Sequence, residues 1–75
     1  MTITFQIRGD FITLDALLKA TGISPSGAQA KMMIAAGEVV VDGNLETRKT
    51  RKLRGGEKVE VQDLVIILQS SKTEE

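Results

Sequence analysis

Five of the seven residues from 48 to 54 are basic, and this segment contains no acidic residue. The rest of the chain is acidic, because residues 1–47 hold three bases and five acids and residues 55–75 hold two bases and five acids. The positive and negative charges cancel over the whole chain, whose net charge is zero. Such a concentration of one sign is more informative than the total. We call residues 48–54 the basic segment; its cations are Arg48, Lys49, Arg51, Lys52 and Arg54.

The chemistry that fits the basic segment is contact with a nucleic-acid backbone. Arginine presents a planar fork that can contact one phosphate twice, whereas lysine acts as a point charge. Each phosphate that is neutralised also releases condensed counterions. We expect the five cations to face outward, unpaired by the protein's own carboxylates. A solvated loop that merely discourages edge pairing is the alternative.

Four further polar residues are weaker candidates for the same surface. Ser26 and Lys31 lie in a predicted helix whose amino end would add exposed N–H donors, so they are expected to meet a neighbouring phosphate if that helix borders the same face. Gln29, on the opposite flank, and Asn44, in a predicted hairpin, have side chains that can hydrogen-bond sugar or base edges. Each of the four also fits an ordinary surface position.

The composition argues against an enzyme. The chain has no cysteine and no histidine, which removes thiolate chemistry, the usual general base and the commonest metal ligand. The acidic residues Glu57, Glu60 and Asp63 lack a nucleophile beside them, and Gly55-Gly56 lacks the Lys-Ser/Thr ending of a phosphate-binding loop. We therefore expect no catalytic residue, no metal site, no cofactor and no small-molecule substrate.

Aromatic residues are scarce, since Phe5 and Phe11 are the only two. Single-strand binders usually stack bases on exposed aromatic rings. We therefore expect recognition of the shape and backbone of structured RNA, with little sequence readout. No stretch approaches the ~20 apolar residues that span a bilayer, and the first residues lack a secretion signal, so a cytoplasmic protein without a membrane partner is expected. We also expect a monomer.

The first half of the chain predicts a strand and two helices. Residues 2–7 alternate apolar and polar side chains, as in a half-buried strand. Thr13 is placed to cap a short helix that ends near Gly22 and whose apolar face is Leu14, Leu17 and Leu18. For the second helix we expect Ser24 as the cap, Pro25 in the first position and an end at Gly37. Its inward residues would be Ala30, Met33 and Ile34.

The second half predicts strands. Val39–Val41 is followed by Asp42-Gly43, a strong signal for a tight hairpin turn, and Leu45 resumes a strand. Leu53 is the apolar anchor inside the basic segment. A turn at Gly55-Gly56 and an alternating strand at 58–62 follow, and then the apolar run 64–68 fits a strand buried on both sides or a short helix.

These elements make an α+β domain, with two helices packed on a small, mainly antiparallel sheet of four or five strands. We expect one domain over residues 1–68. Residues 69–75 are polar, carry no apolar pattern and are expected to form a flexible carboxyl-terminal tail.

From residue 26 onward the order of residues resembles a known family. The chain is similar to the αL RNA-binding motif, named after small-subunit ribosomal protein S-four, and more narrowly to small stand-alone bacterial members of the YbcJ-like type. The resemblance covers roughly residues 11 to 63. The residues that carry it are Ser26, Gly27-Ala28-Gln29-Ala30-Lys31, Met33-Ile34, Gly37, Val39-x-Val41, Asp42-Gly43, the basic segment and Gly56-Glu57-x-Val59-x-Val61.

The resemblance implies RNA binding without catalysis, commonly to ribosomal, transfer or other structured RNA. Our first hypothesis is therefore an RNA-binding module that acts alone and associates with ribosomal particles or their precursors. Two positions depart from the family pattern. Gly27 stands where the family usually has a phosphate-binding arginine, and the hairpin turn is Asp42-Gly43 where Asn-Gly is frequent.

A protein-interaction module is the competing hypothesis. It rests on the neutral total charge and on Ala28, Met32 and Ala35, which fall on the outward side of the second helix. An exposed methionine among small residues suits a partner surface. Scattered surface apolar residues are also normal.

Overall fold

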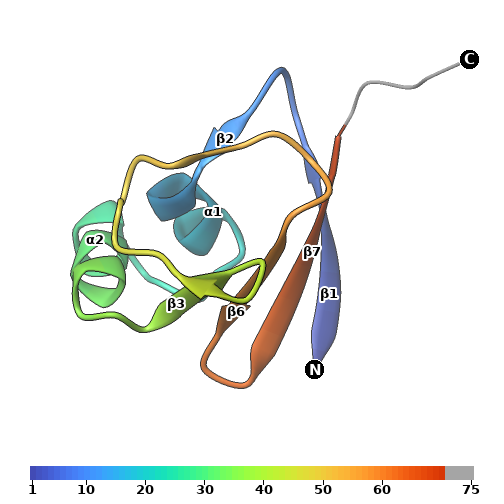
Figure 1. Cartoon of the computed structure of the whole chain (residues 1–75). Coiled ribbons are helices and arrows are strands. Elements are labelled where there is room, and N and C mark those ends of the chain that lie inside the picture. Colours follow the sequence, from blue (N-terminus) through green and yellow to red (C-terminus); the bar gives the residue numbers. More distant parts are fainter. Residues whose placement is uncertain (71–75) are drawn as a thin grey trace, which may run out of the picture.

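A five-stranded sheet in the order β1-β7-β6-β3-β4 forms one layer of the computed structural model, which describes residues 1–70 (Figure 1). β1 runs parallel to β7, and every other neighbouring pair is antiparallel. The strands are β1 (Thr2–Ile7), β3 (Val39–Val41), β4 (Asn44–Leu45), β6 (Lys58–Val61) and β7 (Leu64–Ser70). This architecture confirms the predicted α+β class and its mainly antiparallel sheet.

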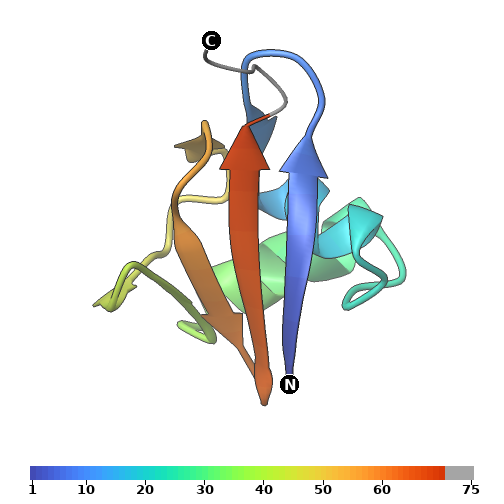
Figure 2. The ribbon, with the colours of Figure 1, turned by 90° about the vertical axis from the view of Figure 1, so that its right-hand side faces the viewer.

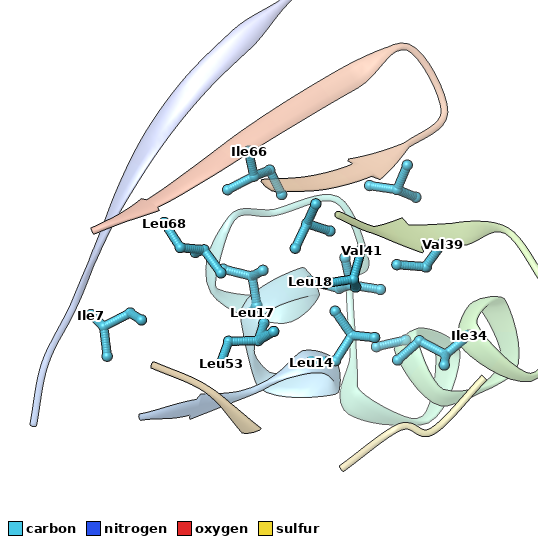
Figure 3. Close-up of a cluster of buried hydrophobic side chains, with 13 residues drawn as sticks. Ile7, Leu14, Leu17, Leu18, Ile34, Val39, Val41, Leu53, Ile66 and Leu68 are labelled. Atoms are coloured by element: carbon cyan, nitrogen blue, oxygen red, sulfur yellow. The ribbon is translucent and has the colours of Figure 1, made fainter. Parts of the chain in front are cut away.

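Two helices, α1 (Leu14–Ala20) and α2 (Gly27–Ala35), lie together on one face of this sheet (Figure 2). A second, two-stranded ladder joins β2 (Ile12–Thr13) to β5 (Lys52–Leu53) beside α1. Between the helices and the sheet lies the apolar core, to which nearly every described element contributes (Figure 3). Its buried members are Ile7, Leu14, Leu17, Leu18, Ala30, Ile34, Val39, Val41, Leu53, Val59, Val61, Ile66 and Leu68.

The apolar run at 64–68 forms a strand, and only one face of it is buried. Ile66 and Leu68 point into the core, whereas Val65 and Ile67 are half-buried on the opposite face. The expectation of burial on both sides was therefore wrong, because both helices cover the same face of the sheet. β7 also continues to Ser70 through pairing with β1, so the first two residues assigned to the tail belong to the sheet. Residues 71–75 lie outside the described part of the chain.

The start of α2 differs from the prediction. Ser26 caps the helix, because its Oγ accepts a hydrogen bond from the backbone N–H of Gln29 at 3.2 Å. Ser24, the predicted cap, is buried and donates its hydroxyl to the Ser26 carbonyl at 2.6 Å. The helix therefore begins at Gly27, two residues later than expected, after Ser26 in an extended conformation. Gly37 follows the helix with φ of +82°, as predicted.

The hairpin between β3 and β4 is the tight turn that the sequence predicts. Val41 pairs with Asn44, so Asp42 and Gly43 form a two-residue loop with φ of +52° and +83°. Positive φ at both central residues defines the type I′ turn that suits the twist of a hairpin. The Asp42 carboxylate also accepts a hydrogen bond from the Lys58 N–H at 2.9 Å, which ties the turn to β6.

Candidate nucleic-acid interface

The basic segment begins in the connection between β4 and β5, which runs from the hairpin towards β2 (Figure 1, yellow). Leu53 fixes the end of this connection, because its side chain is fully buried among the core residues (Figure 3). Two carbonyls of the segment fix its middle. The N–H groups of Leu14 and Asp15 donate to the carbonyls of Arg51 and Lys49 at 2.9 and 3.0 Å. These N–H groups open α1 and have no partner inside the helix, so the segment caps α1 while α1 orders the segment.

Glu46 is the buried acid at the base of the segment, with 8% of its side chain exposed. Arg48 contacts it twice, from Nε to Oε2 at 3.0 Å and from NH2 to Oε1 at 3.2 Å. The Arg48 backbone N–H also donates to Oε2 at 2.9 Å, and Arg51 NH1 donates to Oε1 at 2.9 Å. One carboxylate thus accepts four hydrogen bonds and orients two guanidinium groups.

These contacts lower the pKa of Glu46 from 4.5 to about 2. The side-chain hydrogen bonds from Arg48 are the largest cause, burial opposes them by disfavouring the charged form, and the Arg51 hydrogen bond adds to the lowering. The same pairing raises the pKa of Arg48. The carboxylate is therefore ionised throughout the physiological range and balances one of the two positive charges beside it.

The expectation that all five cations would be unpaired was wrong for Arg48 and Arg51. The physical reason is the buried Glu46, which cannot remain charged away from water without cationic partners. The pairing is incomplete, however, because one carboxylate faces two guanidinium groups. Residues 46–54 retain a net charge of +4. The side chain of Arg48 is also 73% exposed.

Lys49, Lys52 and Arg54 meet the expectation, since each is exposed and makes no ion pair within residues 1–70. The basic segment also lines a depression of about 490 Å³, with Arg48, Thr50, Arg51 and Lys52 in its wall. The two arginines that pair with Glu46 and one lysine without an ion pair among the described residues thus line the same depression. A phosphate group in this depression would lie among several donors.

Gly55 and Glu57, which follow the basic segment, have a structural role. Glu57 accepts hydrogen bonds from the N–H groups of Arg54 and Gly55 at 3.0 and 2.8 Å. The backbone of Gly55 packs so closely on Ser70 that an added Cβ would lie 2.8 Å from the Ser70 nitrogen. The turn is therefore held by Glu57 and by β7, and the Arg54 side chain remains unpaired among the described residues.

Phe11 belongs to this surface, although the sequence did not identify it as a site residue. It is 40% exposed and precedes β2, which pairs with β5. Lys52 Nζ lies 5.2 Å from the centroid of its ring, and Arg54 Cζ lies 5.7 Å from it. Both distances fall in the range of cation–π contact. The pairing of β2 with β5 would have revealed this neighbour, but two-residue strands carry too little periodicity to be predicted.

The four weaker candidates are not brought to the basic segment by any described contact. The Ser26 hydroxyl is occupied in capping α2. Lys31 is exposed on α2, and the Asn44 side chain donates to the Asp42 carbonyl at 3.4 Å within the hairpin. Gln29 lines a different depression, of about 260 Å³, whose other residues are Met32, Met33, Ala36 and Glu38.

Residues 1–70 contain neither a metal-ligand cluster nor a membrane-spanning helix. No group of three or more acidic residues there is arranged to hold a metal ion. None of the described helices has the length and apolar character needed to cross a bilayer.

Comparison with known proteins identifies the family to which the fold belongs. The model of the S4 domain family matches residues 5–68, so the chain belongs to the S4 domain family. S4 domains are RNA-binding modules without catalytic activity, in agreement with the expectation that the chain is not an enzyme.

Particular relatives are similar over most of the chain. The protein named "Putative RNA-binding protein YbcJ" in Escherichia coli (strain K12) is 54% identical over 57 residues, which are 75% of this chain and 81% of that protein. The "Uncharacterized protein YbcJ" of Shigella flexneri matches to the same extent. The solution structure of Escherichia coli YbcJ, described as revealing an αL motif involved in RNA binding, superposes with a TM-score of 0.63 and 42% identity and covers 85% of both chains.

Proposed function

We propose that this protein binds structured RNA, ribosomal or transfer RNA in the first place, by holding phosphates of the backbone on the surface of the basic segment. The observation that carries the proposal is the depression lined by Arg48, Thr50, Arg51 and Lys52, beside the unpaired cations Lys49 and Arg54. Membership of the S4 domain family and the similarity to YbcJ support it.

The zero net charge of the chain does not oppose binding of a polyanion. The Debye length is about 8 Å at physiological ionic strength, so charges farther away than this are largely screened. The field near the depression is therefore set by the charges that lie close to it in space. Residues 46–54 supply a net charge of +4. Asp15, whose N–H donates to the Lys49 carbonyl, and Glu57, which accepts from the Arg54 N–H, lie beside the segment and offset part of this charge.

The pairing with Glu46 favours this function because it orders the two arginines before RNA arrives. Each guanidinium group has five N–H donors, and Glu46 uses two from Arg48 and one from Arg51. The remaining donors have no partner within residues 1–70 and can reach phosphate oxygens. Ordering side chains in advance reduces the conformational entropy that binding removes.

The test compares two double variants of equal charge. Lys49→Glu/Lys52→Glu reverses two exposed cations of the basic segment, whereas Lys19→Glu/Lys58→Glu reverses two exposed lysines outside it. Fluorescence anisotropy with a labelled RNA duplex measures the dissociation constant of each variant. We expect the first variant to lose binding and the second to stay close to the wild type.

The variants are chosen so that loss of binding is not loss of folding. Neither lysine of the first variant contacts Glu46, whereas reversing Arg51 would bring a second carboxylate beside that buried acid. Circular dichroism checks that both variants keep the fold. Equal affinity of the two double variants would reject the proposal.

A protein-interaction role remains a second candidate because of a separate surface on α2. Met32 is 68% exposed and lines the 260 Å³ depression together with Met33 and Ala36. A pull-down from nuclease-treated lysate that recovers a defined protein, and loses it with Met32→Glu, would favour this role. Recovery of RNA alone from untreated lysate would count against it.

A further inference from the structure

The ladder between β2 and β5 has one buried and one exposed face, and its exposed face combines an aromatic ring with two cations. Side chains alternate along a strand, and Leu53 points into the core. Its neighbours Lys52 and Arg54 must therefore point outward. Ile12 pairs with Leu53, so continuing the register by one residue places Phe11 opposite Arg54 on that outward face.

The distances agree with this register. The ring of Phe11 lies within cation–π range of Lys52 Nζ and Arg54 Cζ, at 5.2 and 5.7 Å from its centroid. Phe11 is 40% exposed, whereas Phe5 is half-buried and packs against the core. Phe11 is thus the one exposed aromatic side chain of residues 1–70.

Lys52 also connects this ring to the depression of the basic segment, because it lines that depression and lies over the ring. A nucleotide whose phosphate lies at Lys52 has its base within reach of Phe11. In RNA complexes, unstacked bases stack on aromatic rings and on the planes of arginine guanidinium groups. A base inside a continuous helix cannot do so, because its two faces are covered by its neighbours.

We infer that Phe11, with Lys52 and Arg54, forms a binding site for one unpaired base next to a helical stem. The inference rests on the proposed function and narrows its RNA class to helices interrupted by a bulge or ending in an overhang. Stacking tolerates any base, so the site selects unpaired structure with little dependence on sequence.

The experiment compares a blunt RNA duplex with the same duplex carrying a single bulged adenine or a single-nucleotide overhang. Anisotropy gives the dissociation constant for each RNA with wild-type protein, Phe11→Leu, Phe11→Trp and the control Phe5→Leu. For the wild type we expect tighter binding of at least one interrupted duplex, by roughly 5- to 150-fold relative to the blunt one. Phe11→Leu should abolish this preference, so that blunt and interrupted duplexes bind with similar affinity, whereas Phe11→Trp and Phe5→Leu should keep it.

A fluorescent base makes the contact itself visible. With 2-aminopurine at the unpaired position, binding of the wild type should change its emission, and binding of Phe11→Leu should not. Equal losses of affinity on blunt and interrupted duplexes, or no preference in the wild type, would overturn the inference. Failure of the wild type to bind the blunt duplex in a salt-dependent manner would instead refute the proposed function, so the two failures are distinguishable.

Discussion

Replacing Glu46 by glutamine tests the ion pairs that order the basic segment. The pKa of this carboxyl falls from 4.5 to about 2 in the folded chain, and a shift of this size corresponds to at most about 3 kcal/mol of stability. Arg48, its main partner, has 73% of its side chain exposed, and solvent screens such a pair. We therefore expect Glu46→Gln to lower the free energy of unfolding by about 1–2 kcal/mol near neutral pH.

The sign of the pH dependence follows from the lowered pKa. A carboxyl that binds protons more weakly when folded stabilises the fold above its unfolded pKa, here 4.5, and loses that contribution as the pH falls to about 2. Urea unfolding of wild type and Glu46→Gln across this range should therefore give curves that differ near neutral pH and converge in acid. Glu38→Gln, at an exposed glutamate without an ion pair among the described residues, is the matched control. A Glu46→Gln protein as stable as the wild type near neutral pH, or an equal difference at every pH, would refute the reasoning.

Three other substitutions test the fold and the limits of the site. Leu53→Ala removes the buried anchor of the segment and should cost about 2–5 kcal/mol in urea unfolding; a cost below that of a surface mutation would contradict its role. Gly55→Ala should be more damaging than Gly43→Ala, because both positions have positive φ but only at Gly55 does the new Cβ meet Ser70; equal thermal shifts would speak against that contact. Ser26→Ala should cost about 1 kcal/mol through the lost helix cap and leave the RNA affinity intact, and a selective loss of RNA affinity would restore Ser26 to the site.

Much of the fold could be predicted from local patterns. The β3–β4 hairpin was predictable because Asp-Gly after three valines specifies a tight turn, and Gly37 because helices often end in a left-handed residue. The order of the strands could not be predicted in this way. β1 lies beside β7, from the other end of the chain, and their pairing depends on tertiary packing that no local period encodes.

The location of the candidate site could be proposed from the sequence, but its electrostatics could be predicted only in part. The basic segment follows from charge alone, and its anchor Leu53 from being the one apolar residue within it. The pairing of Glu46 had a signal in the sequence, because an acid two residues before Arg48 can reach it. The burial of Glu46 had no signal in the sequence, because glutamate side chains are usually exposed. Phe11 needed the register of the β2–β5 ladder before it could be assigned to the site.

The salt dependence of RNA binding is the most direct measurement of the central claim. If about four phosphates are held, the logarithm of the association constant should fall with the logarithm of salt concentration at a slope of about −3 to −4, by scaling from duplex DNA. Neutralising two cations in Lys49→Gln/Lys52→Gln should make that slope shallower by about two, because each lost phosphate contact removes about one unit. The same slope in wild type and variant would contradict the assignment of these lysines to the RNA backbone.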